Sequence, residues 1–331
     1  MAVYFLNLKT FGRSDGSSAP GAAAYRAGER IRDERTGKTY DHADRQDVMH
    51  KEIVVPSRFA DSDIGWAKDR ASLWNAAEAA ESRKNARVAR EYLVALPVEL
   101  TPDQRLGLVR GFSQELSDRY RFAVDFAIHA PRDFPGSDPR NFHAHLLATT
   151  REVGTAGLMA KTSLELNDEK RRKLGLDPVI NELLYVRERW AAVTNEALRN
   201  AHLAVRIDHR TLEAQGIDRE PQPRIPQAAF ELERRGYRSV VAERIREDFA
   251  ARVQARLERT PSPTPIPTAT LRSTAAQSSD HATAAADPKL GKSPSLEEIR
   301  REARESWLRQ RQKSAESSAG KDQTRDDDLA L

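Results

Sequence analysis

Three histidines in the middle of the chain have the spacing of a metal site. His143 and His145 flank Ala144 in a β-prone run, so in a strand their imidazoles point to the same face. His129 ends an earlier β-prone run, and the Pro-, Asp- and Gly-rich stretch 131–141 between the runs predicts a hairpin. Three imidazoles without a thiolate suit a divalent ion with open positions for substrate oxygens. We therefore predict a metal site here.

The apolar residues of the earlier run decide which way His129 points. Phe122, Val124, Phe126 and Ile128 occupy alternate positions and form one apolar face of the predicted strand. His129 is out of phase with them, so it points to the opposite face, where the other two histidines can meet it. The alternative is chance, because two histidines at i and i+2 occur in many proteins without a metal. The third histidine on the partner strand favours a metal site over chance.

Tyr25 is a candidate nucleophile. It lies in the first turns of a predicted helix over 22–32, after the Gly- and Ser-rich stretch 12–21. A tyrosine on such a helix is most often a partly buried core residue with its hydroxyl at the rim. Its position on the helix therefore does not single it out, and its case depends on the residues around it.

The elements that must position these residues predict an α+β fold. Strands are expected at 3–8, 51–55, 87–96, 122–130 and 142–150, and helices at 22–32, 63–84, 102–120, 163–174, 178–202 and 227–258. Thr101 followed by Pro102 is typical of a helix start. A hairpin among interspersed helices indicates a central antiparallel sheet flanked by helices, followed by helical segments.

Composition divides the 331 residues into three parts. Residues 1–225 carry the mixed pattern, residues 226–259 suggest one highly charged helix, and residues 260–331 form a low-complexity tail. A tail rich in Pro, Ala, Ser and Thr cannot bury a core and is expected to be disordered. One short helix is expected within it, at 295–312, because its first residues have the spacing of a capping box.

The bulk composition excludes several classes of protein. The sequence has no run of about twenty apolar residues and no signal-peptide pattern, so we expect no membrane insertion and a cytoplasmic location. The absence of cysteine excludes disulfides and thiolate metal sites. The formal net charge of +4 is too small to identify a nucleic-acid partner, although a local basic groove is compatible with it.

Several motifs, in the right order, make residues 1–225 resemble the MobA/MobL family of plasmid-mobilisation relaxases. They lie at 22–37, 71–78, 87–97, 128–129, 141–147 and 208–221. The first motif contains Tyr25, and the fifth contains the two closely spaced histidines. Relatives often have proline where Phe142 stands. The resemblance implies a histidine–hydrophobic–histidine endonuclease fold, with a central antiparallel sheet between helices.

The resemblance also implies roles for particular residues. Tyr25 is the implied nucleophile, and His129, His143 and His145 are the implied ligands of a divalent metal ion, with Mn²⁺ or Mg²⁺ expected and Zn²⁺ as the alternative. Glu91 matches an acidic position near the family's active site, where it would orient a histidine or take the tyrosine proton. The alternative for Glu91 is a plain surface carboxylate.

The implied activity is nicking and resealing of one DNA strand at a plasmid origin of transfer, through a covalent 5′-phosphotyrosyl intermediate. The implied partners are single-stranded origin DNA, auxiliary mobilisation proteins and a type IV secretion coupling protein. By position in the chain alone, the candidates for contacts with the DNA backbone are Arg26, Arg83, Lys84, Arg151 and Lys161.

Three rival functions share parts of this pattern. A rolling-circle replication initiator or transposase would use the same metal and tyrosine chemistry, but the motifs around Tyr25 and at 208–221 favour a relaxase. A catalytically inactive relaxase-like DNA-binding protein is disfavoured because every expected catalytic position is filled. A metal-dependent hydrolase that activates water would form no covalent adduct with DNA.

Overall fold

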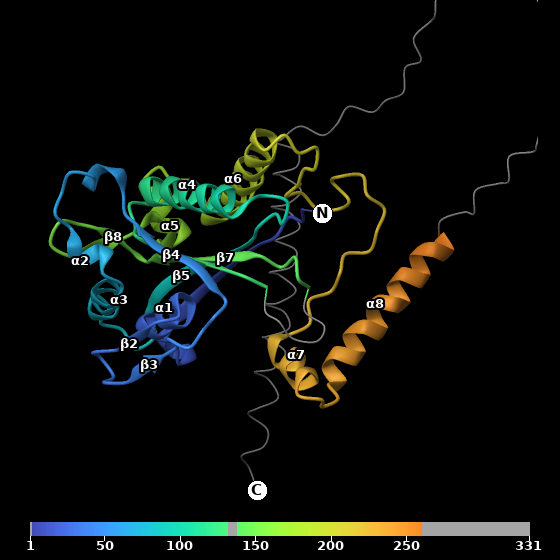
Figure 1. The fold of residues 1–331 in the computed structure, drawn as a ribbon, viewed down its shortest axis with the longest axis horizontal. Coiled ribbons are helices and arrows are strands. Elements are labelled where there is room, and N and C mark those ends of the chain that lie inside the picture. The colour runs from blue at the N-terminus through green and yellow to red at the C-terminus, as the bar shows by residue number, and fades with distance from the viewer. Residues whose placement is uncertain (1, 132–137, 260–331) are drawn as a thin grey trace, which may run out of the picture. The chain divides into compact units, whose positions relative to one another are not determined.

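The computed structural model of the protein describes residues 2–131 and 138–259. The chain separates into two units, residues 1–261 and 262–331. The expected tail from residue 260 and its helix at 295–312 lie outside the described residues. Within the described part, a central sheet carries helices on both of its faces (Figure 1).

A five-stranded antiparallel sheet forms the centre of the fold. In spatial order its strands are β1 (Leu6–Gly12), β5 (Arg87–Ala95), β7 (His143–Thr149), β6 (Val124–His129) and β4 (Val48–Val54). Each neighbouring pair is antiparallel. Two small ribbons join β2 (Arg30–Arg32) to β3 (Thr39–Asp41) and β8 (Arg151–Val153) to β9 (Leu158–Lys161). The expected α+β fold and the expected hairpin are confirmed.

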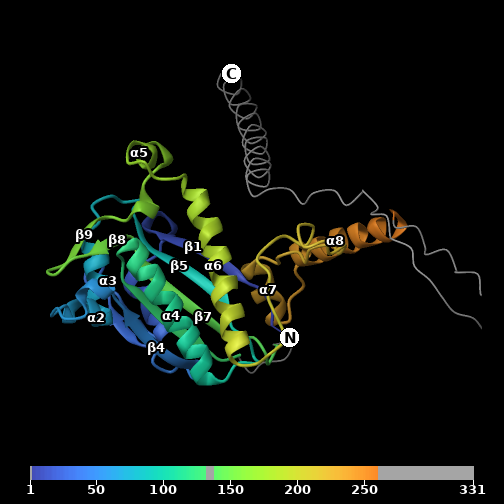
Figure 2. The same ribbon diagram turned by 90° about the horizontal axis from the view of Figure 1, so that it is seen from above.

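Two long helices cover one face of the sheet. α4 (Pro102–Tyr120) and α6 (Val179–Asn200) lie side by side on this face (Figure 2). Thr101 caps α4, as the sequence indicates, and it also forms a capping box with Gln104. The rings of Phe112 and Trp190 meet with centroids 5.0 Å apart between the two helices. The apolar stripe of β6 packs into this same core, with Val124, Phe126 and Ile128 all buried.

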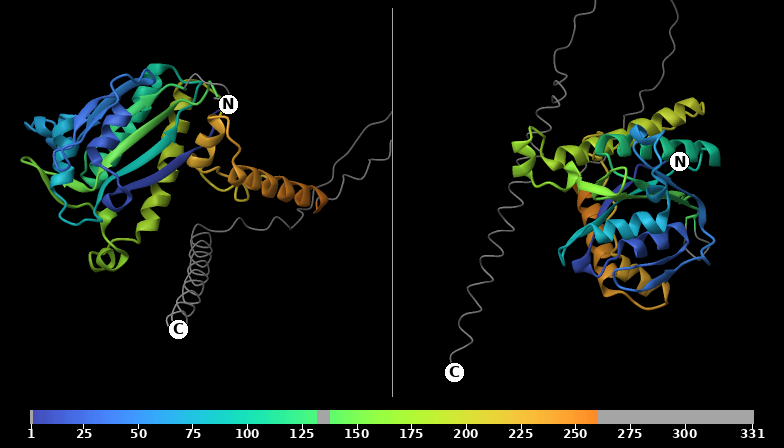
Figure 3. Two further views of the ribbon diagram at one scale, coloured as in Figure 1. Left: turned by 90° about the horizontal axis from the view of Figure 1, so that it is seen from below. Right: turned by 90° about the vertical axis from the view of Figure 1, so that its left-hand side faces the viewer.

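Shorter helices cover the opposite face. α1 (Ala19–Ala27), α2 (Gly65–Lys68) and α3 (Arg70–Ala79) form this layer, which Figure 3 shows across the sheet from α4. Their core includes the fully buried Trp74, whose Nε1 donates to Asp125 of β6 at 2.9 Å. Because both faces are covered, the residues of β6 that alternate with its apolar stripe are buried as well. No helix of the described ranges is long and apolar enough to cross a membrane.

Two expected helices of the N-terminal half have different bounds. The helix expected at 22–32 begins at Ala19, capped by Ser18, and ends at Gly28 with φ +58°, so residues 30–32 form β2 instead. The helix expected at 63–84 is two helices, because Asp69 is extended between them and caps α3 by accepting from the Ser72 N–H. In both cases a local cap overrides the longer apolar pattern.

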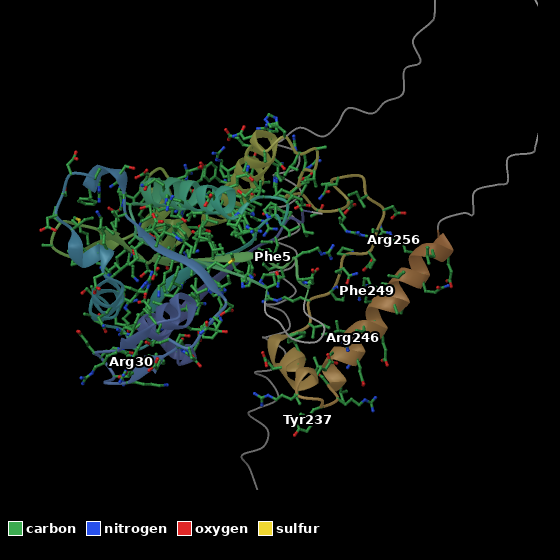
Figure 4. All side chains as sticks on the ribbon, viewed as in Figure 1. Phe5, Arg30, Tyr237, Arg246, Phe249 and Arg256 are labelled. Atoms are coloured by element: carbon green, nitrogen blue, oxygen red, sulfur yellow. The ribbon has the colours of Figure 1, made fainter. Side chains whose placement is uncertain are left out.

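The expected single helix over 226–259 is also two helices. α7 (Gln227–Arg234) and α8 (Val240–Arg259) are separated at Gly236, whose φ of +82° is unsuited to a continuous helix. Arg246 of α8, labelled in Figure 4, donates to Glu233 of α7 at 2.7 Å. The remaining described helix is α5 (Asp168–Lys173), and short 3₁₀ turns lie at Arg13–Asp15, Ser57–Phe59 and Ser163–Glu165.

Candidate metal centre and nucleophile

The hairpin of β6 and β7 brings the three histidines together. His129 lies opposite His143 in the register, and Ala127 lies opposite His145. One ring nitrogen from each histidine lies within 4.8 Å of the others, and the ring centroids are 4.7 to 5.3 Å apart. The expected convergence of these side chains is therefore confirmed. They share the face of the sheet that α1 covers, away from the apolar stripe.

Hydrogen bonds on the far side of two rings set their tautomers. Nδ1 of His143 lies 2.9 Å from the Asn141 carbonyl oxygen, and Nδ1 of His145 lies 2.6 Å from the Glu91 carboxylate. Both partners are acceptors, so in the neutral form of each ring Nδ1 carries the proton and the lone pair is on Nε2. This is the arrangement in which a protein orients histidines for a metal ion.

His129 is held differently. Its Nε2 donates to the Arg26 carbonyl oxygen at 2.7 Å, and its Nδ1 lies 3.3 Å from a guanidinium nitrogen of Arg45. The side chain is almost completely buried. A metal ion bound to His129 needs one of these two nitrogens, so binding would exchange one of the contacts for a metal–nitrogen bond.

Burial keeps two of the imidazoles neutral. Desolvation, aided by the nearby His145 and Arg45, lowers the pKa of His129 to about 3. Desolvation also lowers the pKa of His145, although the Glu91 carboxylate opposes it. Both rings are therefore uncharged at neutral pH. Because a protonated imidazole cannot bind a metal ion, this is the state that metal binding requires.

Glu91 is a buried carboxylate, not the surface group that was the alternative. It lies on β5, is 4% exposed, and accepts from Arg26 Nε at 2.5 Å as well as from His145. Burial alone would raise the pKa of Glu91, but hydrogen bonds from His145 and Arg26, and the positive charge of Arg26, outweigh it and lower the pKa to about 2. A group so weakly basic is ionised and suited to orienting His145, and it is a poor acceptor for a tyrosine proton.

Tyr25 lies one residue from the contact between α1 and the histidines. Arg26 touches the cluster twice, through its carbonyl to His129 and its guanidinium to Glu91. Tyr25 is 39% exposed, so part of this residue is accessible from solvent. The ring lies under the Arg45 guanidinium at 4.3 Å and meets His42 edge-on at 5.2 Å. The nucleophile candidate and the metal-site candidate are thus neighbours.

Arg45 is the residue that sequence reasoning missed. It contacts the Tyr25 ring and the His129 imidazole, donates to the Tyr25 carbonyl oxygen at 2.6 Å, and pairs with Asp47. It lies in the connection between β3 and β4, where no periodic pattern marks it. The loop around Arg45 has a mixed polar sequence, and nothing in that sequence marks Arg45 as a site residue.

Three of the cations expected by position to contact DNA are engaged inside the protein. Arg26 pairs with Glu91, and Arg151 and Lys161 both pair with Glu81, at 2.7 and 2.6 Å. These ion pairs argue against a role in DNA contact for these side chains. Arg83 and Lys84 are exposed, in the connection between α3 and β5.

The MobA/MobL family model matches residues 17–235, which include all of these site residues. The chain belongs to the MobA/MobL family. The match extends ten residues beyond the boundary expected at 225, to the end of α7. Family membership and the antiparallel sheet agree with the fold that the motifs implied.

Relatives of this MobA/MobL protein include mobilisation proteins. It is 37% identical to the mobilization protein MobL of Acidithiobacillus ferridurans, over 78% of this chain and 70% of that protein. It is also 37% identical to a 43 kDa relaxation protein of Salmonella typhimurium, over 66% of this chain and 57% of that protein. A solved structure concerned with vancomycin resistance transfer in Staphylococcus aureus matches with 27% identity and a TM-score of 0.51, covering 63% of this chain and 100% of that one.

Proposed function

We propose that this MobA/MobL protein is a DNA relaxase, which nicks one strand at an origin of transfer and thereby initiates conjugative mobilisation. The observation that carries the proposal is the placement of Tyr25 beside three converging histidines, with Arg26 contacting both His129 and Glu91. The names of the relatives, mobilization protein and relaxation protein, support the same activity.

The histidines fit a divalent metal ion. His143 and His145 present Nε2 lone pairs, burial keeps His129 and His145 neutral, and the donor atoms lie within 4.8 Å of one another. An all-nitrogen donor set suits Mn²⁺ or Zn²⁺ better than Mg²⁺, which prefers oxygen ligands. When bound, the ion would supply Lewis-acid stabilisation of charge on a phosphate oxygen.

The proposed chemical step belongs to Tyr25. Its phenolic oxygen attacks the phosphorus, forming a bond to the 5′-phosphate as the bond to the 3′ oxygen breaks. The phenol loses its proton to solvent, and the leaving 3′ oxygen takes up a proton to become a 3′-hydroxyl. Because the phosphotyrosyl bond conserves the energy of the phosphodiester, the 3′-hydroxyl can attack it in reverse and reseal the strand.

Two further side chains would act as positioning residues. Glu91 holds the Nδ1–H of His145 and, being ionised, keeps that ring in its metal-binding tautomer. Arg45 lies over the Tyr25 ring and limits its movement. The guanidinium would also offer positive charge to the phosphate that approaches Tyr25.

A strand-transfer assay tests the proposal. Purified protein is incubated with Mn²⁺ and two single-stranded oligonucleotides, one carrying the origin of transfer of the encoding element and one carrying its replication origin. A relaxase should cleave and exchange only the first. Cleavage at the replication origin alone would instead indicate a replication initiator, and cleavage without strand exchange would indicate a hydrolase that uses water.

We further propose that the substrate is single-stranded DNA, delivered with auxiliary mobilisation proteins to a type IV secretion coupling protein. The support is the family and the conjugal transfer function named in relatives such as TraA of Agrobacterium fabrum, which is 30% identical over 67% of this chain. Pull-down of the full chain with the coupling protein of the same element tests this. Absence of any complex in the presence of origin DNA would contradict it.

A further inference from the structure

A polar cavity of about 300 Å³ lies beside the N-terminal end of α1. Its lining comes from the turn after β1, from the β2–β3 ribbon and from the connection between α3 and β5. Three of the lining residues are cations and five carry a hydroxyl group, and no carboxylate or histidine belongs to the lining. Figure 1 shows the β2–β3 ribbon beside α1, on the layer that also carries Tyr25.

The two arginines of this cavity are held in place by buried carboxylates. Arg13 and Arg35 both donate to Glu78, at 2.9 and 3.0 Å, and the Glu78 side chain is only 1% exposed. Arg35 also lies 3.9 Å from the buried Asp33. The charges of the two guanidinium groups are thus balanced by two carboxylates, and the Lys84 ammonium leaves one net positive charge at the cavity.

Lys84 contributes the exposed part of this charge. Its side chain is exposed, and among the described residues no carboxylate lies within ion-pair distance of its ammonium group. Thr36 and Ser82 are exposed beside it and present hydroxyl groups to the same cavity. An open cavity with a guanidinium, an ammonium and several hydroxyl donors has the chemistry that recognises a phosphate group.

The cavity and the nucleophile are joined by one helix. Ser18, which lines the cavity, is the N-cap of α1, and Tyr25 is seven residues further along the same helix. The helical rise places them roughly 10 Å apart along the axis. That is about three nucleotides at the 3.4 Å axial spacing of one strand in duplex DNA, and a more extended single strand covers it with fewer. A strand with one phosphate at Tyr25 can therefore place a nearby phosphate in the cavity.

We propose that this cavity binds a backbone phosphate of the single DNA strand, a few nucleotides from the phosphate that Tyr25 attacks. Lys84 and Arg35 supply the positive charge, and the exposed hydroxyl groups of Thr36 and Ser82 donate hydrogen bonds to the phosphate oxygens. The inference rests on the proposed relaxase function and adds to it a second anchor for the strand. Such contacts set the position of the backbone and carry no base sequence.

The salt dependence of DNA binding tests this inference. Full-length protein is titrated with fluorescent thirty-nucleotide oligo-dT in EDTA at several salt concentrations. Lys84→Ala should reduce the slope of log K against log salt by about 0.7. Between 1 M and 0.1 M salt, the affinity of the variant should therefore fall behind that of the wild type by about fivefold. The matched control is Lys68→Ala, an exposed lysine of α2 outside the cavity, which should keep the wild-type slope.

Three results would overturn the inference. An unchanged slope in Lys84→Ala would show that no DNA phosphate is bound there, and equal changes in both variants would show only diffuse electrostatic attraction. If ³¹P NMR showed inorganic phosphate binding that Lys84→Ala abolishes while the DNA slope is unchanged, the cavity would be a site for the free anion. In all three cases the wild-type protein would still bind and cleave origin DNA. If the proposed relaxase function were wrong, the wild-type protein would not cleave it.

Discussion

At the scale of single residues, Arg26 and Arg45 connect the proposed nucleophile to the histidines. Arg26 follows Tyr25 in α1, and its carbonyl and guanidinium groups contact His129 and Glu91. Arg45 contacts both the Tyr25 ring and the His129 imidazole. A change at either arginine therefore alters both the tyrosine and the proposed metal site, which makes the neighbouring side chains informative to mutate.

Glu91→Gln should weaken both metal binding and fold stability, and each is measured separately. Loss of a carboxylate that orients a histidine ligand should weaken metal binding by about 10- to 100-fold, measured by titration calorimetry with Mn²⁺. Breaking the buried pair with Arg26 should lower the free energy of unfolding by about 3 kcal/mol at pH 7, measured in urea. Metal affinity equal to that of the wild type would contradict the orienting role.

The same pair predicts how stability depends on pH. The pKa of Glu91 is lowered on folding from 4.5 to about 2, so its stabilisation is complete above pH 4.5 and is lost as the pH falls towards 2. The difference in unfolding free energy between the wild type and Glu91→Gln should therefore shrink below pH 4.5. A difference that stays constant from pH 6 to pH 3 would show that folding does not lower the pKa of Glu91.

Arg45→Ala should slow DNA cleavage by about tenfold, because a small displacement of a nucleophile has a large effect on rate. Metal affinity should stay the same or increase, since the substitution removes a cation from beside His129. Arg30→Ala, at a side chain that is 71% exposed on β2, is the matched control and should cleave normally. If Arg45→Ala lowered metal affinity and cleavage together, the substitution would have disrupted the fold, and this result would contradict the proposed role of Arg45.

At the scale of elements, strand alternation explains what the sequence could predict. The period of two in a strand placed His143 and His145 on one face and His129 opposite the apolar stripe, so this part of the site was predictable. The contact of Arg45 with Tyr25 was not, because it depends on a loop whose path is set by tertiary packing. The cap at Asp69 and the turn at Gly236 likewise interrupt helices whose apolar or charged patterns run on.

Gly28→Ala tests the end of α1 against a matched glycine. Gly28 has φ +58°, and an added Cβ would lie 3.2 Å from Val48 and 3.4 Å from the Cβ of Arg45. Gly37 has φ +72°, with open space around its Cβ position. Both substitutions should cost about 1 kcal/mol of unfolding free energy from backbone strain, but only Gly28→Ala should also slow DNA cleavage. Equal cleavage by both variants would contradict the link between this helix end and Tyr25.

At the scale of the whole molecule, the described unit holds the proposed chemistry, and residues 260–331 lie outside the described residues. From its composition we predict that the tail is a tether or a recruitment signal for an auxiliary protein or the secretion channel. Deleting residues 260–331 should spare strand cleavage in vitro and reduce transfer between cells in a mating assay. Loss of cleavage by the shortened protein would contradict this role.

The central claim is that Tyr25 becomes covalently joined to DNA at a metal-bound site. Its most direct test is denaturing electrophoresis after incubation with a 3′-labelled oligonucleotide carrying the origin of transfer. The wild type and the control Tyr237→Phe, at the exposed tyrosine between α7 and α8 (Figure 4), should give a labelled protein band. EDTA should abolish the band and Mn²⁺ should restore it.

Tyr25→Phe should give no labelled band under any of these conditions, because it lacks the oxygen that forms the phosphotyrosyl bond. A labelled band in Tyr25→Phe would show that another residue is the nucleophile. Cleaved DNA without any labelled band in the wild type would show that water, and not Tyr25, attacks the phosphorus.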